Sequence, residues 1–150
     1  MALRVFVDAN VFVTASNSPS TGSANVVILR LAEAGLIEAV TSAQVVAECE
    51  RVIRRKFPAA LPAFHALLPA SRTTVAANPA PGELAAFAGH ADETDLVHLV
   101  VALREQCPFL VTHNVADFLP GHPDVTVCRP AEFVHLVRLY LAGLTAPHDE

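Results

Sequence analysis

The stretch LRVFVDAN, residues 3–10, decides the fold, because an apolar run begins almost at the first residue and stops at an aspartate. A short run rich in branched and aromatic residues is typical of a central strand that is buried on both faces. Asp8 and Asn10 follow this strand directly. Ligands bind at the carboxyl ends of parallel strands, so both residues are candidates for a functional site. Aspartate is also a common cap between a strand and a helix, and for Asp8 that alternative stays open.

Strands and helices alternate along the rest of the chain. Short apolar runs predict further strands at residues 36–41, 73–76, 109–112 and 125–128. Capping residues, glycines and prolines delimit the expected helices at 24–34, 42–56, 58–68, 91–106 and 130–141, with a short helix through residue 87 and one helical turn within 113–120. We therefore expect an α/β fold, a three-layer α/β/α sandwich around a mostly parallel sheet of about five strands.

Length and composition indicate one well-packed domain. The chain has 150 residues, of which 53% are hydrophobic and 17% charged, and this balance argues for a filled core. We expect a single domain over residues 1–144 and a frayed tail over 145–150. No signal peptide is visible, and no stretch approaches the ~18 apolar residues of a membrane span. The three cysteines lack a CxxC pair, which predicts free buried thiols and a cytoplasmic location.

Missing motifs exclude several classes of functional site. The sequence has no glycine-rich nucleotide-binding loop, no GxSxG motif and no HExxH or HxxxH spacing among its seven histidines. What remains is a set of oxygen ligands without thiols, which suits Mg²⁺ or Mn²⁺. The formal net charge of −5 disfavours binding to nucleic acid by charge alone. Bound divalent cations would cancel part of the field of an acidic site, so the net charge does not exclude nucleic acid as a partner.

Asp92 and Asp95 open the helix expected at 91–106, just before the fourth predicted strand. A capping box explains their spacing without any functional role, because Asp92 would cap the helix and Asp95 would favour its dipole. Asp95 also projects from the first helical turn and can face the crevice at the edge of the sheet. Both roles can coexist, one for each residue.

The loop after the fourth predicted strand carries a second group of polar residues. Asn114 and Asp117 are expected at the same sheet edge as Asp8, although either can simply cap a turn. His113 is of the type that serves as a general base, but a solvent-facing loop histidine is the favoured interpretation. Acids from distant parts of the sequence are thus expected to meet at one edge of the sheet.

Glu48 lies on one flank of the apolar stripe of the helix expected at 42–56. Glu50, on the other flank, has Arg54 four residues further on, which is the spacing of a solvated ion pair. Glu48 has no basic residue at that spacing, so it is slightly favoured as a functional acid. The same helix carries a basic cluster made of Arg51, Arg54, Arg55 and Lys56.

Taken in order, these segments resemble the motifs of PIN-domain proteins. VFVDANVFV (5–13) resembles the opening strand of the family with its Asp-x-Asn, and TS with VAECERVI (41–42 and 46–53) is similar to the second motif. DLVHLVVAL (95–103) and LVTHNVADF (110–118) look like the third and fourth motifs. RPAEF (129–133) resembles the closing turn into the last helix. The resemblance covers nearly the whole chain.

The resemblance implies cleavage of RNA that depends on Mg²⁺ or Mn²⁺. It assigns the catalytic and metal-binding roles to four acids: Asp8, Glu48, Asp95 and Asp117. Asp95 is favoured over Asp92 for the third motif, because it aligns with the apolar run that follows. Four residues would orient water, substrate or a carboxylate: Asn10, Asp92, Thr112 and Asn114. The basic cluster is either a contact to the RNA backbone or a solvated helix face.

The subgroup with the greatest resemblance comprises bacterial PIN proteins similar to VapC-like toxins. This implies an RNA substrate, frequent homodimers and a small antitoxin protein that blocks the site. Many relatives carry an aspartate where this chain has Asn114, so a catalytically weak or inactive PIN scaffold that binds RNA or protein is the alternative. A phosphatase with an aspartate nucleophile is disfavoured, because it expects a second aspartate at the position of Asn10.

Overall fold

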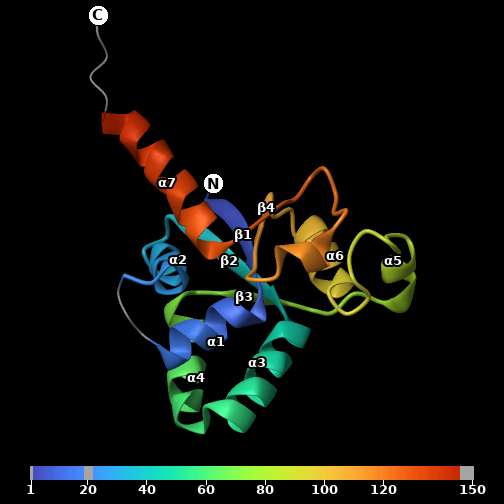
Figure 1. The fold of residues 1–150 in the computed structure, drawn as a ribbon, viewed down its shortest axis with the longest axis horizontal. Helices are drawn as coiled ribbons and strands as arrows, with labels where there is room; N and C mark the ends of the chain where they lie inside the picture. The colour runs from blue at the N-terminus through green and yellow to red at the C-terminus, as the bar shows by residue number, and fades with distance from the viewer. Residues whose placement is uncertain (1, 19–21, 146–150) are drawn as a thin grey trace, which may run out of the picture.

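The computed structural model describes residues 2–18 and 22–145, and within them it has a five-stranded sheet in which all strands are parallel (Figure 1). The strands are β1 (Leu3–Val7), β2 (Ile37–Ser42), β3 (Thr74–Ala76), β4 (Phe109–Val111) and β5 (Thr126–Cys128). Their spatial order is β3-β2-β1-β4-β5, so the strand at the start of the chain is the central one. Phe6 lies opposite Val40 on one side and Leu110 on the other. The predicted parallel sheet is confirmed.

Helices cover both faces of this sheet. They are α1 (Ala9–Asn17), α2 (Ala24–Glu33), α3 (Ala43–Lys56), α4 (Leu61–Ala70), α5 (Pro81–Ala85), α6 (Leu96–Arg104) and α7 (Pro130–Thr145), with 3₁₀ turns η1 (Pro58–Ala60) and η2 (Val115–Phe118). Figure 1 shows α2 and α7 on one side of the strands and α5 and α6 on the other. Helix α6 packs against β1, β2 and β4, while α2 packs against β2 and α7. The predicted three-layer α/β/α arrangement is confirmed.

Three boundaries differ from those expected from the sequence. The apolar run after Asp8 forms helix α1, because burial of most of its side chains outweighs the weak helix preference of its branched residues. Helix α6 begins at Leu96, and residues 92–95 before it form a separate turn in which the N–H groups of Asp95 and Leu96 both donate to the carbonyl of Asp92. Helix α7 extends to Thr145, the first residue of the predicted tail, and residues 146–150 lie outside the described residues.

The core is built largely from phenylalanines and branched residues. Phe6, Phe12, Phe64, Phe118 and Phe133 are almost completely buried. All three cysteines are buried free thiols, as the sequence predicted. None of the helices in the described ranges is long and apolar enough to cross a membrane.

We predict that Phe64→Ala destabilises the protein by about 3–5 kcal/mol, the usual cost of removing a fully buried aromatic ring from a core. Phe64 on α4 is 0% exposed and meets Phe12 of α1 edge-on, with ring centroids 6.4 Å apart. The measurement is urea unfolding followed by circular dichroism. Phe57→Ala is the control, because Phe57 is 36% exposed, and it should cost less than about 1 kcal/mol. Equal losses in the two variants would contradict the packing described.

Candidate metal centre

The carboxyl ends of β1 and β4 bring Asp8 and Thr112 together, although 104 positions separate them in the sequence. The backbone N–H of Asp8 donates to the carbonyl of Val111 over 3.0 Å. Its Oδ2 accepts a hydrogen bond of 2.7 Å from the Thr112 hydroxyl, and its Oδ1 accepts one of 2.7 Å from the N–H of Ala9. Asp8 is only 6% exposed. Its carboxylate is therefore held at a fixed place, and it also caps α1.

Thr112 connects this strand end to the loop that follows β4. Its hydroxyl oxygen donates to Asp8 and also accepts the backbone N–H of Asn114 over 3.1 Å. The carbonyl of Asn114 in turn accepts the N–H of Asp117 over 3.1 Å. One buried hydroxyl thus sets the position of both the Asp8 carboxylate and the turn that carries Asp117.

Three further carboxylates meet beside this loop. Asp92, Asp95 and Asp117 each offer an oxygen, and these oxygens all lie within 4.8 Å of one another. Asp92 is exposed, whereas the other two are half-buried. Backbone hydrogen bonds hold the cluster, since the N–H of Asp92 donates to the carbonyl of Asp117 over 2.8 Å. None of the ion pairs among the described residues includes these three acids.

Asp95 is the electrostatic centre of the group. Burial raises its pKa to about 6, and the negative charges of four other acids add to the shift: Asp8, Asp117, Glu48 and Asp92. A carboxyl group is harder to ionise when nearby carboxylates are already charged. The other three acids named from the sequence, Asp8, Glu48 and Asp117, therefore lie within electrostatic reach of Asp95. Its side chain makes no helix-capping hydrogen bond, so the capping role considered for it is absent.

The structure gives Asp92 a different place from the one expected. The sequence assigned it to orienting other groups, whereas its carboxylate lies in the same cluster as those of Asp95 and Asp117. The reason is the turn at residues 92–95, which stands before α6 instead of forming its first turn. The spacing of three residues between two aspartates was the available signal, and capping explained it equally well.

Glu48 is half-buried in the second turn of α3 and lies outside the cluster of three. The thiol of its neighbour Cys49 contacts the carbonyl of Ala9 at 3.6 Å, which holds this turn of α3 against the start of α1. Glu50 pairs with His65 of α4 at 3.0 Å, so the expected pair with Arg54 is replaced by a contact between helices. The negative charge of Glu48 contributes to the raised pKa of Asp95, so Glu48 lies within electrostatic reach of the cluster.

His98 is the residue that sequence reasoning missed. It is 1% exposed, its ring stacks on Phe6 at 5.7 Å, and its Nε2 lies 3.8 Å from Oδ1 of Asp8. Burial lowers its pKa, while Asp8 and Glu48 act in the opposite direction. The imidazole is therefore neutral near pH 7 and leaves the charge of Asp8 uncancelled. The signal in the sequence was a titratable residue within an otherwise apolar helix.

His113 differs from the solvent-facing residue expected. It is half-buried, and its Nε2 lies 2.7 Å from Oδ1 of Asn25 on α2. Burial lowers its pKa, and Asp8 opposes that shift. Asn10 is half-buried in the first turn of α1, and Asn114 is exposed at the start of η2. Both asparagines therefore flank the Asp8 end of the site.

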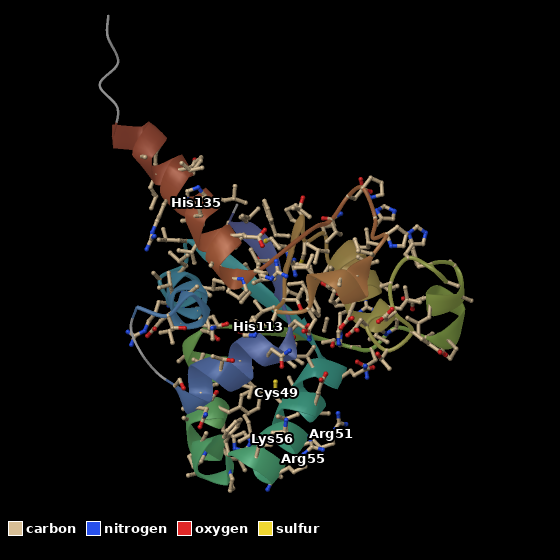
Figure 2. The ribbon with its side chains drawn as sticks, in the orientation of Figure 1. Cys49, Arg51, Arg55, Lys56, His113 and His135 are labelled. Atoms are coloured by element: carbon tan, nitrogen blue, oxygen red, sulfur yellow. The ribbon has the colours of Figure 1, made fainter. Side chains whose placement is uncertain are left out.

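The basic cluster of Arg51, Arg54, Arg55 and Lys56 is exposed on α3, and Figure 2 shows Arg51, Arg55 and Lys56 along that helix. The first turn of α3 touches the acidic turn, since the side-chain amide of Gln44 donates to the carbonyl of Thr94 over 3.4 Å. At 1.5 Å per residue, the cluster begins roughly 10 Å further along the helix and ends near 18 Å. The structure thus places these cations on the same helix as Glu48 but outside the acidic centre.

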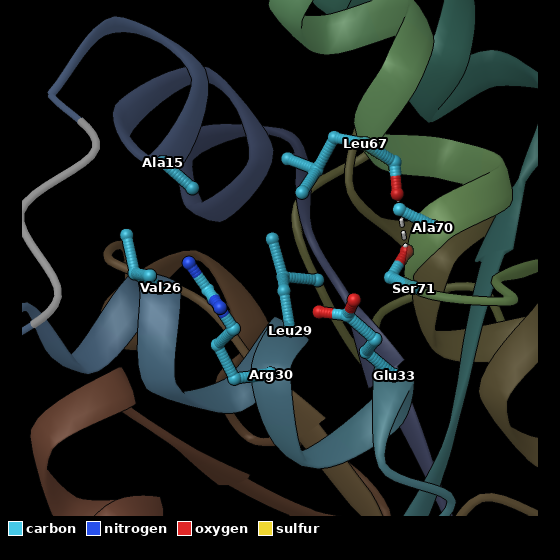
Figure 3. Close-up of a pocket in the computed structure, with 8 residues that line it drawn as sticks. All are labelled: Ala15, Val26, Leu29, Arg30, Glu33, Leu67, Ala70 and Ser71. Atoms are coloured by element: carbon cyan, nitrogen blue, oxygen red, sulfur yellow. Dashed lines mark hydrogen bonds between the residues drawn. The ribbon is translucent and has the colours of Figure 1, made fainter.

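Two hollows of the surface lie away from the clustered acids. A cavity of about 120 Å³ between α1, α2 and α4 is lined by Ala15, Val26, Leu29, Arg30, Glu33, Leu67, Ala70 and Ser71 (Figure 3). A larger apolar groove of about 510 Å³ runs between the start of β1, the end of α2 and helix α7. Neither contains any of the clustered acids.

Two solved structures have a fold similar to that of this chain. VapBC2 from Rickettsia felis, solved bound to a DNA fragment from its promoter, is similar with a TM-score of 0.62 and 18% identity over 85% of this chain and 98% of that one. VapC20 from Mycobacterium tuberculosis, a sarcin-ricin loop cleaving toxin, is similar with a TM-score of 0.51 and 17% identity over 71% and 86% of the two chains. No curated protein matches. At these identities the likeness shows the fold alone.

The family comparison covers most of the chain. A family model described as a PIN domain matches residues 4–116. The matched range contains Asp8, Glu48, Asp92 and Asp95, and it ends one residue before Asp117. The sequence motifs and the fold agree with this match over the same strands. The chain belongs to the PIN-domain family.

Proposed function

We propose that this protein is a metal-dependent endoribonuclease that hydrolyses phosphodiester bonds in RNA and acts as the toxin of a toxin–antitoxin pair. The observation that carries the proposal is the cluster of Asp92, Asp95 and Asp117, whose oxygens lie within 4.8 Å of one another. Membership of the PIN-domain family and the likeness to VapC structures support it.

The residues present fit a hard divalent cation. The cluster offers only carboxylate oxygens, the ligands that Mg²⁺ and Mn²⁺ prefer. Burial is the main cause of the raised pKa of Asp95, and the nearby negative charges that add to it are ones that such a cation would offset. Asp92, Asp95 and Asp117 would hold the ion, and Asp8 and Glu48 would complete the site directly or through water. This assignment adds Asp92 to the four acids expected from the sequence.

In this mechanism, Mg²⁺ or Mn²⁺ supplies a bound water of lowered pKa and stabilises negative charge on the attacked phosphate. The chain provides the geometry. Thr112 keeps the carboxylate of Asp8 fixed through its 2.7 Å hydrogen bond. Asn10 and Asn114 flank that carboxylate and would orient water or the phosphate. The water oxygen bonds to phosphorus while the bond to the 3′-oxygen breaks, which gives 5′-phosphate and 3′-hydroxyl ends by analogy with the family.

A catalytically weak or inactive scaffold that binds RNA or protein is the second candidate. The observation that favours it is the exposed Asn114, an uncharged residue where many relatives carry an aspartate. The cluster in this chain reaches three acids without that position. Binding of Mn²⁺ without any cleavage of RNA would favour the scaffold.

The proposed partners are an antitoxin and a second copy of this chain. A short reading frame directly upstream, whose product blocks cleavage, would distinguish a toxin from a housekeeping nuclease. For the second copy, the surface is the apolar groove along α7, a helix that projects from the body in Figure 1. Its exposed apolar residues are Leu3, Leu36, Leu136, Tyr140 and Leu141. A contiguous exposed apolar surface of this kind is typical of a protein–protein contact.

We predict that Tyr140→Glu weakens self-association at least about tenfold, because a charge would be buried within the proposed interface. Size-exclusion chromatography with light scattering measures the oligomeric state. Val75→Glu is the matched control, since Val75 is an exposed apolar residue on β3 away from the groove, and it should leave the state unchanged. A wild-type protein that is monomeric at high concentration would refute self-association and leave the groove to the antitoxin.

For the reaction, we predict that Asp8→Asn abolishes cleavage of single-stranded RNA in Mn²⁺. Thr112→Val should lower the rate by about 10- to 100-fold, the usual effect of removing a group that orients a metal-site carboxylate. The matched control is Thr126→Val, which changes an exposed threonine on β5 and should cleave at the wild-type rate. A Thr112→Val variant with full activity would mean that the hydrogen bond to Asp8 plays no part in catalysis.

We predict a pH dependence that follows Asp95. Its pKa of about 6 in the folded protein lies above the value of 3.8 expected when unfolded, so this group lowers the free energy of unfolding as pH rises from about 4 to about 6. In EDTA at pH 7.5, Asp95→Asn should therefore be more stable than wild type by about 1 kcal/mol after allowance for solvent screening, and the gain should vanish at pH 4. Thermal unfolding at both pH values measures it.

The same variant should lose the stabilisation that Mn²⁺ gives the wild type. Below pH 6, protons compete for Asp95, so the apparent Mn²⁺ affinity of the wild type should fall by about tenfold per pH unit. Glu93→Gln is the control, because Glu93 is exposed in the same turn and outside the cluster. If Glu93→Gln and Asp95→Asn respond alike to pH and metal, the assignment of the ion to this cluster is wrong.

A further inference from the structure

Three aromatic rings gather beside the acidic centre and have no role in the mechanism above. The rings of Phe87, His90 and His122 lie with their centroids 5.8 to 6.1 Å apart. Each residue is half-buried, and the side chain of His122 is 20% exposed. We call these three residues the aromatic cluster. They come from the segment after α5 and from the loop after η2.

The backbone fixes this cluster in place. The N–H of Gly121 donates to the carbonyl of His90 over 2.8 Å, and Nδ1 of His90 lies 2.8 Å from the carbonyl of Gly121. Gly121 has a φ of +79°, and an added Cβ would meet the carbonyl of Phe118 at 3.0 Å. Only glycine suits both constraints. Hydrogen bonds within the protein thus hold together the two segments that carry the rings, so their arrangement does not depend on a bound ligand.

The same two segments carry the candidate metal ligands. The N–H of Asp92 donates to the carbonyl of Asp117 over 2.8 Å, and the contact of Gly121 with His90 lies next to it along both segments. His90 precedes Asp92 by two residues, so their Cα atoms are separated by at most about 7 Å. Figure 1 shows the two segments side by side next to α6. A ligand whose phosphate sits on the acids therefore has its neighbouring atoms close to the rings.

The hydrogen bonds also assign the protons of the two imidazoles. A carbonyl only accepts, so Nδ1 of His90 carries a proton and its Nε2 is an acceptor when neutral. Nδ1 of His122 accepts the N–H of Asp124 over 3.1 Å, so its Nε2 carries the proton and donates. The aromatic cluster thus offers ring faces together with one donor and one acceptor. Nucleobases have a flat π face and an edge that combines donors with acceptors.

We propose that the aromatic cluster of Phe87, His90 and His122 is a subsite that stacks one unpaired base of RNA next to the phosphate held at the acidic centre. The proposal rests on the proposed function. With a net charge of −5 and the basic cluster roughly 10 Å or more away along α3, charge alone does not hold RNA at this edge. Stacking supplies binding that does not depend on charge and selects single-stranded over paired RNA.

The competing explanation is that the rings merely pack the loop after η2 against the segment after α5. The two explanations predict different effects. Loss of packing lowers the melting temperature and leaves the affinity for RNA unchanged. Loss of a stacking surface weakens binding only when the RNA carries the base that would stack.

The test uses the full chain and a single-stranded RNA with 2-aminopurine, a base whose fluorescence falls on stacking, next to the cleaved phosphate. Binding is measured on the Asp8→Asn background, where the RNA stays intact, and cleavage on the otherwise wild-type protein in Mn²⁺. Phe87→Leu and His122→Leu should raise Kd and KM by at least about fivefold, while kcat stays within about twofold. His122→Phe keeps a ring and should retain most of the affinity, and Phe57→Leu is the control at an exposed phenylalanine.

An abasic residue at the probed position should remove the difference between the variants and wild type. If the variants keep wild-type Kd and KM, with or without a lower melting temperature, the rings only pack the loop and the proposal is overturned while the nuclease assignment stands. If the variants weaken abasic RNA equally, stacking is also overturned. If the wild-type protein neither binds nor cleaves single-stranded RNA, the proposed function fails together with the subsite.

Discussion

The structure depends on the position of β1 between β2 and β4, because that position places Asp8 where the two neighbouring strands end. The carboxylate of Asp8 is then held by the Thr112 hydroxyl and by the N–H of Ala9, both at 2.7 Å. Two elements distant in sequence are joined at one buried acid, and the turn with Asp117 follows from the same threonine. The same contacts at this edge of the sheet therefore join β1 to the end of β4 and position the acids of the candidate metal centre.

A cluster of acids opposes folding, because like charges repel one another. Asp92 is exposed and the other two acids are only half-buried, which limits that cost. Asp95 sits among four other carboxyl groups, and its pKa near 6 reflects the work of ionising it there. His98 stacks on Phe6 in the core, and burial lowers its pKa. Its imidazole therefore does not supply a positive charge to offset the carboxylates. A divalent cation bound at the cluster would offset the negative charges around Asp95.

The parts of the fold and of the candidate site that could be predicted from the sequence are those that local patterns specify. The strands and most helices follow from runs and caps that span a few residues, and Asp8, Asp95 and Asp117 follow from their place after or before such elements. Side-chain pairings across elements do not leave such a pattern. Asp92 joins the cluster only because residues 92–95 form a separate turn, and Glu50 finds His65 on another helix instead of Arg54. His98 looked like an interruption of an apolar helix, since its neighbour Asp8 lies 90 positions away.

The distribution of charge then constrains how a polyanion approaches this surface. The acidic centre repels phosphates unless a cation covers it, and the arginines of α3 lie outside it on the same helix as Glu48. A strand of RNA that reaches the acids from α3 passes from cations to carboxylates and then to the rings beside Asp92 and Asp117. Along the proposed path, attraction by charge, coordination by metal and stacking would act on successive parts of one ligand. Because each of these contributes at a separate place, a protein with a net negative charge can hold nucleic acid without a continuous basic groove.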